Sequence, residues 1–153
     1  NVIKAVKETV SIPVIGNGDI FTAEDAWEKA NFSGVDGIML ARGIFGNPWL
    51  IKQIKEKFTL GEVKTFPTIT DRIETIRRHS QFMLEDYGEK ATVMEIRKHV
   101  CWYVKGLKNS HEFKERVNRC NAADELTRII DDYMEEMKRE ELLEKENEKQ
   151  YNQ

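Results

Sequence analysis

Apolar residues in the first sixty positions follow two patterns in turn. Short continuous runs at residues 12–15 and 37–40 are typical of strands that are buried on both faces of a parallel sheet. Helical spacing precedes, separates and follows these runs, around residues 2–6, 22–31 and 49–54. Because single strands alternate with helices through short links, this region is predicted to consist of βα units that share a parallel sheet.

Beyond residue 69 the apolar spacing is helical throughout. Thr22 in the first region and Thr70 here are predicted helix N-caps, because a threonine hydroxyl can accept a hydrogen bond from a free amide of the first turn. The helical region is predicted to hold four helices, over residues 70–87, 93–107, 111–120 and from residue 122 onward. Four amphipathic helices joined by short links predict a small helical bundle.

The two patterns are separated by residues 58–69, which contain Gly61 and Pro67 and are predicted to form a linker. In the last helix the apolar stripe ends at Leu143. The predicted organisation is an α/β region over residues 1–57, a linker over 58–69, a helical domain over 70–143 and a frayed or disordered tail over 144–153.

Length and charge limit the classes of function. The chain has 153 residues, with 24 basic and 27 acidic side chains and a net charge of −3, which excludes a uniformly basic nucleic-acid binder. The charge is unevenly distributed, since residues 70–121 carry eleven basic and eight acidic side chains, whereas residues 122–153 carry five and eleven. No stretch approaches the roughly 20 apolar residues that span a bilayer, so no membrane partner is expected.

Two glycine-containing loops follow the predicted strands. The first is Gly16-Asn17-Gly18-Asp19, and the second is Ala41-Arg42-Gly43 at the start of a helix. Exposed amides in such turns can bind an anion, and an arginine adds charge-assisted hydrogen bonds. Each loop alone is most simply an ordinary turn. Together, at the carboxyl ends of consecutive parallel strands, they have the arrangement of the phosphate site in a (β/α)₈ barrel.

A basic face is predicted on the second helix of the helical region. At about 100° per residue, one side of this helix holds Arg97, Lys98, Trp102, Lys105 and Lys108. Such a face can contact phosphates and stack on a base. The periodicity alone favours an ordinary solvated face with Trp102 packed against a neighbouring helix.

The cysteines and histidines of the chain do not indicate a metal site or a catalytic nucleophile. Cys101 and Cys120 are far apart and form no CxxC motif, and Cys101 is predicted to be a packing residue. The three histidines lack the spacing of metal ligands, so no metal is expected.

Four blocks of the chain together resemble the bacterial tRNA-dihydrouridine synthases, most closely the B type. They are Ile12-Pro13-Val14-Ile15-Gly16-Asn17-Gly18-Asp19-Ile20, Gly37-Ile38-Met39-Leu40-Ala41-Arg42-Gly43, Gly46-Asn47-Pro48-Trp49, and Arg97-Lys98-His99 with Trp102-Tyr103-Val104-Lys105-Gly106. The resemblance extends to about Asp132. It implies a (β/α)₈ TIM barrel followed by a helical tRNA-binding domain in a cytoplasmic enzyme.

The family resemblance implies an oxidoreductase that uses FMN and NADPH to reduce uridine to 5,6-dihydrouridine in tRNA, with the target base flipped into the site. Carried over by position, Asn17, Gly18, Asp19, Ala41 and Arg42 would bind FMN, the last two at its phosphate. The residues Arg97, Lys98 and Lys105 would belong to the tRNA-binding domain.

The cysteine that acts as catalytic acid in this family has no counterpart here. Cys101 and Cys120 lie in the helical region, so no catalytic residue is assigned to this chain. The sequence is therefore interpreted as a C-terminal fragment, inactive alone, that holds the last two βα units of the barrel and the helical domain. Two strands cannot close a barrel, so self-association of the fragment is also expected.

Two other interpretations remain open. One is another FMN-dependent TIM-barrel oxidoreductase that acts on a small metabolite, which leaves the Arg97–Gly106 block without a role. The other is a helical protein-interaction module whose last helix pairs with a partner. The sequence does not say which tRNA uridine would be modified.

Overall fold

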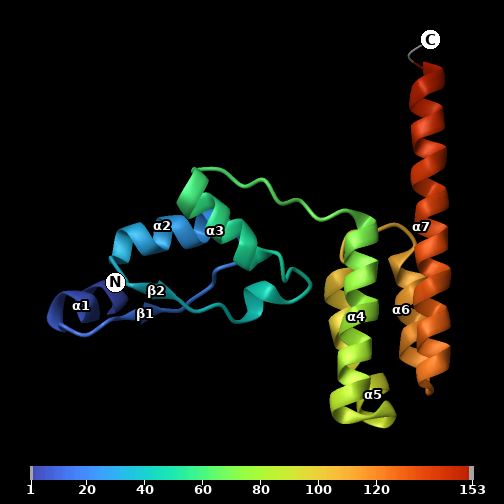
Figure 1. The fold of residues 1–153 in the computed structure, drawn as a ribbon, viewed down its shortest axis with the longest axis horizontal. Coiled ribbons are helices and arrows are strands. Elements are labelled where there is room, and N and C mark those ends of the chain that lie inside the picture. The colour runs from blue at the N-terminus through green and yellow to red at the C-terminus, as the bar shows by residue number, and fades with distance from the viewer. Residues whose placement is uncertain (1, 152–153) are drawn as a thin grey trace. The chain divides into compact units, whose positions relative to one another are not determined.

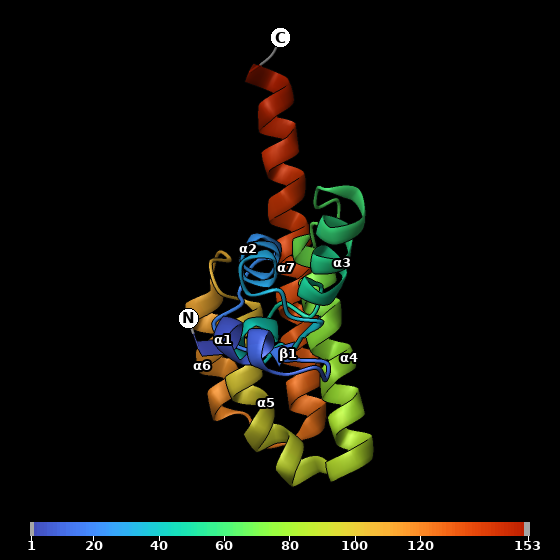
Figure 2. The same ribbon diagram turned by 90° about the vertical axis from the view of Figure 1, so that its left-hand side faces the viewer.

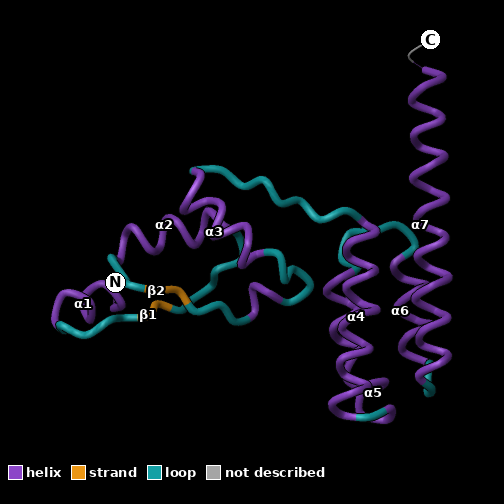
Figure 3. Tube along the Cα trace, in the orientation of Figure 1, coloured by secondary structure: helices purple, strands orange, loops and turns teal. Residues whose placement is uncertain are grey.

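The computed structural model describes residues 2–151, without the side chains of residues 144, 145 and 148–151, and it divides into two units at Phe66 and Pro67. The first, called the α/β unit, contains α1 (Val2–Thr9), β1 (Ile15–Gly16), α2 (Ala23–Ser33), β2 (Gly37–Ile38), a 3₁₀ turn (Arg42–Ile44) and α3 (Leu50–Leu60). The second, called the helical unit, contains α4 (Ile69–Tyr87), α5 (Glu89–Tyr103), α6 (Ser110–Arg119) and α7 (Ala123–Tyr151). Figure 1 labels these elements, and Figure 3 shows how short the two strands are beside the helices.

The α/β unit has the predicted alternation of helices and parallel strands. β1 and β2 pair in parallel, with Ile15 opposite Gly37 and Gly16 opposite Ile38. The helix between them, α2, begins with a capping box in which the Thr22 hydroxyl accepts from the Asp25 amide and the Asp25 carboxylate accepts from the Thr22 amide. The predicted N-cap at Thr22 is therefore confirmed. Hydrogen bonds from the Phe21 and Thr22 groups outweigh desolvation and lower the pKa of Asp25.

The strands differ from the prediction in their exposure. Ile12 and Ile15 are 67% and 68% exposed, and Met39 is also exposed. The prediction that both apolar runs are buried on both faces is therefore wrong for this chain. The reason is that the described sheet has only two strands, so β1 and β2 have no further strand to cover them. The buried apolar residues of this unit are Ile20, Ala23, Ala26 and Leu50.

The helical unit has a continuous apolar core. All four helices contribute to it, and α4 packs against both α5 and α7. Tyr133 of α7 belongs to this core, only 1% exposed and stacked on Phe113 with 4.2 Å between the ring centroids. Its hydroxyl donates to the Lys108 carbonyl at 2.7 Å, which fastens the link before α6 to α7. Most of the buried apolar residues of the described chain therefore lie in this unit.

Several predicted boundaries change in the structure. Helix α3 continues to Leu60, so the start of the expected linker is helical. The N-cap of α4 is Thr68 in a capping box with Asp71, and the predicted cap at Thr70 is wrong. Helix α5 ends at Tyr103, because the chain turns there through Gly106 at φ 82° and Asn109 at φ 51°.

The last helix is longer than predicted. Helix α7 runs to Tyr151 and extends past the ends of α4 and α6 (Figures 1 and 2), whereas the sequence indicated a frayed or disordered tail over residues 144–153. Glutamate and lysine, which dominate this segment, are good helix formers even without an apolar stripe. Residues 152 and 153 lie outside the described part of the chain. Among the described residues, no helix combines the length and apolar content required to cross a bilayer.

Candidate functional site

The two loops singled out in the sequence lie beside each other at the carboxyl ends of β1 and β2. The Arg42 guanidinium binds the Asp19 carboxylate at 2.8 Å, and the Asn17 side-chain amide donates to the Met39 carbonyl at 3.2 Å. The parallel pairing of the strands places the loops at the same edge. The structure therefore brings the two candidate loops together, as the sequence predicts.

Gly43 allows the loops to approach each other. A Cβ atom at this position would lie 1.8 Å from the Ile20 carbonyl oxygen and 3.2 Å from a Leu50 methyl group. Ile20 and Leu50 are both buried, and the carbonyl belongs to the backbone, so neither can easily move away. Only glycine fits at this close approach.

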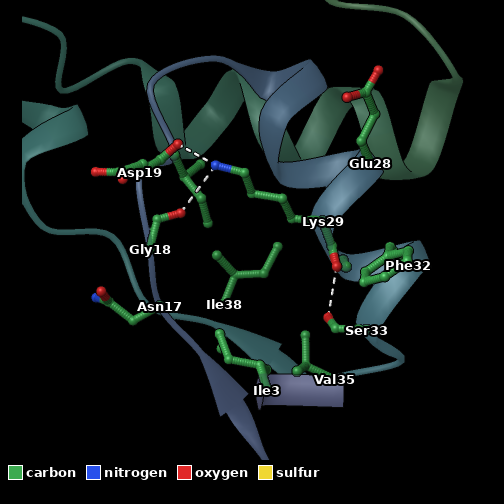
Figure 4. A pocket seen from close by; sticks show the side chains of 13 residues that line it. Ile3, Asn17, Gly18, Asp19, Glu28, Lys29, Phe32, Ser33, Val35 and Ile38 are labelled. Atoms are coloured by element: carbon green, nitrogen blue, oxygen red, sulfur yellow. Dashed lines mark hydrogen bonds between the residues drawn. The ribbon is translucent and has the colours of Figure 1, made fainter. Parts of the chain in front are cut away.

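The loop after β1 holds an unusual backbone conformation. Gly18 has φ 149° and Asp19 has φ 44°, a left-handed value that is uncommon for a residue with a side chain. The ammonium group of Lys29, which extends from α2, donates to the Gly18 carbonyl at 3.1 Å and to the Asp19 carbonyl at 2.5 Å. Figure 4 shows this side chain reaching across to both oxygens. The Lys29 ammonium group therefore holds this loop in its conformation.

Between the loops lies a cleft of about 130 Å³, lined by Asn17–Phe21, Met39 and Ala41–Gly43. Its donors are the Arg42 guanidinium and the Asn17 amide, and the Arg42 side chain is 73% exposed. An exposed ion pair contributes little to stability, so Arg42 can exchange Asp19 for an anionic ligand at low cost. These groups fit a phosphate monoester, which accepts charge-assisted hydrogen bonds from guanidinium and amide groups.

A larger cavity of about 500 Å³ lies on the other side of the same loop (Figure 4). Its lining is mainly apolar, with Ile3 from α1, Phe32 from α2 and Ile38 from β2. Glu28 and Lys29 are the charged residues of its α2 wall. Because the Lys29 ammonium is occupied by the loop carbonyls, this cavity offers chiefly hydrophobic contacts.

The predicted basic face of the helical unit is divided by the structure. Arg97 is half-buried and donates to the Cys120 carbonyl at 2.6 Å, and Lys98 pairs with Glu95 one turn earlier on α5. Lys105 is exposed but follows the end of α5, so it does not continue the same helical face. The prediction of one continuous face is therefore wrong, because the helix stops at Tyr103. Trp102 is 47% exposed.

The two cysteines lie in different environments of the helical unit. Cys101 is exposed, which contradicts its predicted packing role, and Cys120 is buried in the helical unit. Burial raises the pKa of the Cys120 thiol above its ordinary value. Among the described residues no group of three or more His, Cys, Asp or Glu side chains is placed to hold a metal ion.

Two clusters of side chains in the helical unit were not recognised by the reasoning from sequence above. His79 of α4 and His99 of α5 stack edge to face with ring centroids 4.7 Å apart, and burial lowers the pKa of both. Arg116, Arg119 and Arg128 line a common groove between α6 and α7. The first cluster joins separate helices and leaves no sequence signal. The i, i+3 spacing of Arg116 and Arg119 was a usable signal for the second.

Comparison with known proteins gives consistent matches. Residues 1–142 match the family model described as dihydrouridine synthase. The "Probable tRNA-dihydrouridine synthase" of Rickettsia conorii is 46% identical over 119 residues, which are 78% of this chain and 36% of that protein. A protein of the same name from Mycobacterium tuberculosis H37Rv is 35% identical over 121 residues, 79% of this chain and 31% of that protein. The "tRNA-dihydrouridine synthase B" of Pasteurella multocida is 36% identical over 116 residues, 76% of this chain and 35% of that protein. The chain thus spans about a third of the length of the curated relatives it matches.

Proposed function

Because this chain belongs to the dihydrouridine synthase family, we propose that it supplies part of the cofactor site and the tRNA-binding unit of an enzyme that reduces uridine to dihydrouridine in tRNA. The α/β unit would provide the last two βα units of a (β/α)₈ barrel. The observation that carries this proposal is the joining of the two strand-end loops through Arg42, Asp19 and Gly43. In a barrel, this pair of loops is the usual phosphate site.

The cleft between these loops would hold the phosphate of FMN, with NADPH as reductant. Arg42 and the backbone at Ala41 would bind the phosphate oxygens, while Asn17, Gly18 and Asp19 would form the opposite wall. Asp19 would give up its exposed ion pair with Arg42 to the phosphate and would remain part of this wall. The bound flavin would supply the hydride for the uracil ring.

The helical unit would bind tRNA. Lys98 and Lys105 are exposed, and their positive charge suits phosphate contacts. Arg97 would contribute to tRNA binding indirectly, because its hydrogen bond to the Cys120 carbonyl holds the end of α6 in place. Family membership supports tRNA as the substrate over a small metabolite, and it gives the helical unit a purpose that the metabolite alternative does not.

The proton that completes uracil reduction would not come from this chain's cysteines. Cys120 is buried with a raised pKa, and Cys101 lies on α5 of the helical unit. We therefore expect the chain alone, mixed with FMN, NADPH and tRNA, to form no dihydrouridine.

A chimera tests the proposal. The matched segment of the Pasteurella multocida synthase would be replaced by residues 1–142 of this chain and expressed in bacteria that lack their own dihydrouridine synthases. Dihydrouridine in the tRNA, measured by mass spectrometry, is expected to return. In the purified chimera, Arg42→Gln should weaken FMN binding about tenfold or more, because a charge-assisted hydrogen bond to phosphate is lost. The matched control is Lys52→Gln, which removes an exposed charge from α3. A folded chimera that binds tRNA without forming dihydrouridine would contradict the proposed function.

Self-association of the isolated chain is a second expectation. Ile12, Ile15 and Phe32 are apolar and at least half exposed in the α/β unit, and burying them against a second copy removes them from water. Sedimentation velocity at micromolar concentration should show dimers or larger species. Ile15→Lys, which places a charge on the open strand, should shift the distribution toward monomer. A wild-type chain that sediments as a monomer at these concentrations is the opposing result.

A further inference from the structure

Helices α6 and α7 form an open groove of about 550 Å³ that no part of the proposed cofactor site uses. Three arginines line it, Arg116 and Arg119 from α6 and Arg128 from α7. Two carboxylates, Glu125 and Asp132, belong to the same lining. The groove therefore carries one more positive than negative charge, although α7 as a whole is acidic.

The three guanidinium groups are only partly used by the protein. Arg116 pairs with Asp132 across the groove, and Arg119 approaches Glu115 at 3.8 Å with its side chain 81% exposed. Arg128 donates through Nε to the Asp124 carbonyl at 3.3 Å. Because a guanidinium has five N–H donors in a planar fork, each of these arginines keeps donors for a ligand in the groove.

The turn at the end of the groove is held in place from behind. Arg97 of α5 donates to the carbonyl of Cys120, the residue that ends α6. The Cys120 side chain is fully buried, and its thiol donates to the Ala122 carbonyl at 3.1 Å. Arg119 therefore extends from a fixed helix end, which lowers the entropy lost when it binds a ligand.

We propose that the α6–α7 groove, rather than the exposed face of α5, is the main binding site for RNA backbone phosphates on the helical unit; this rests on the proposed function, in which the unit binds tRNA. Arg116 and Arg119 are three residues apart on one helix, about 4.5 Å along its axis. Because positions i and i+3 lie on the same face of a helix, the two guanidinium groups can reach the same stretch of RNA backbone. Arginine also binds phosphate through two parallel hydrogen bonds, which lysine cannot do. On α5, Arg97 is half-buried and committed to the Cys120 carbonyl, and Lys98 has no planar fork of donors.

The test measures binding of the full chain to an unmodified tRNA transcript by fluorescence anisotropy across a series of salt concentrations. The double variant Arg119→Gln, Arg128→Gln is expected to lose about tenfold in affinity and to reduce the salt slope by about 1 for each arginine. The matched control, Arg78→Gln, removes one exposed arginine from α4, outside the groove. It should change affinity by less than about twofold. Lys98→Gln should have a smaller effect than either groove substitution.

The outcomes distinguish failure of the proposed function from failure of the groove assignment. A wild-type chain that shows no tRNA binding would overturn the proposed function together with the groove assignment. A chain that binds tRNA but loses no more affinity in the groove variant than in Arg78→Gln would overturn the groove alone. Polyglutamate that competes as well as RNA at equal charge would assign the groove to an acidic protein partner, which also overturns the proposal. Circular dichroism melting confirms that each variant is folded, and Arg119→Gln, at a highly exposed position, keeps the test valid if another variant unfolds.

Discussion

Replacing Gly43 with alanine is expected to destabilise the α/β unit by about 3 kcal/mol, the upper end of the range for overpacking. The added Cβ would meet the Ile20 carbonyl oxygen at 1.8 Å, which is far inside van der Waals contact. Relief requires the loop after β2 to move away from the loop after β1. Such a movement would also separate Arg42 from Asp19, which lie 2.8 Å apart. Flavin affinity in the chimera should fall with stability.

Urea unfolding measures this effect through the fluorescence of Trp27 and Trp49, in a Trp102→Phe background that silences the helical unit. Gly37→Ala is the matched control. Its Cβ would lie 3.6 Å from Ile15, an ordinary contact, although Gly37 belongs to the adjoining strand. The control should change the free energy of unfolding by less than about 1 kcal/mol. Equal stability of the two variants would show that the close approach at Gly43 does not hold the loops together.

Truncating Tyr133 to alanine is expected to destabilise the helical unit by about 3–5 kcal/mol, as for other large aromatic residues removed from a core. The ring is 1% exposed and stacks on Phe113, and the hydroxyl binds the Lys108 carbonyl. The substitution would remove the contact that links α6 to α7 and would leave a cavity between these helices. RNA binding should therefore weaken as well, since the α6–α7 groove depends on the spacing of both helices.

The conservative variant Tyr133→Phe separates packing from hydrogen bonding. It keeps the stacked ring and loses only the hydroxyl, so it should cost about 1 kcal/mol in urea unfolding followed by circular dichroism. The dependence of stability on alkaline pH gives a second test of this variant. Burial, with a smaller contribution from the nearby Glu136 charge, raises the pKa of Tyr133 to about 12. An unfolded tyrosine loses its proton near pH 10, so stability falls as pH rises from about 10 to 12. Tyr133→Phe should lose less stability than wild type over this interval. Identical losses would show that Tyr133 does not titrate in this way.

Much of the secondary structure could be predicted from local patterns. The alternation of strands and helices, the cap at Thr22 and the four helices beyond residue 69 depend on spacing and on single residues. The prediction that the two glycine-containing loops meet was also correct, because parallel strands carry their carboxyl ends to one edge. Boundaries were less predictable: Thr68 and Thr70 are both good caps by residue type, and Thr68 is the cap because Asp71, three residues after it, completes a capping box.

What the sequence determined by itself was the order of elements, the family and the chemistry offered by each loop. These properties follow from short-range periodicity and from the residue types at consecutive positions. The tertiary structure alone decided that Gly43 abuts the Ile20 carbonyl, that Arg97 is committed to Cys120 and that three arginines share the α6–α7 groove. It also decided that Ile12, Ile15 and Met39 of the two apolar runs are exposed. Each of these depends on which residues from distant parts of the chain come into contact, and a contact of that kind leaves no periodic trace in either segment.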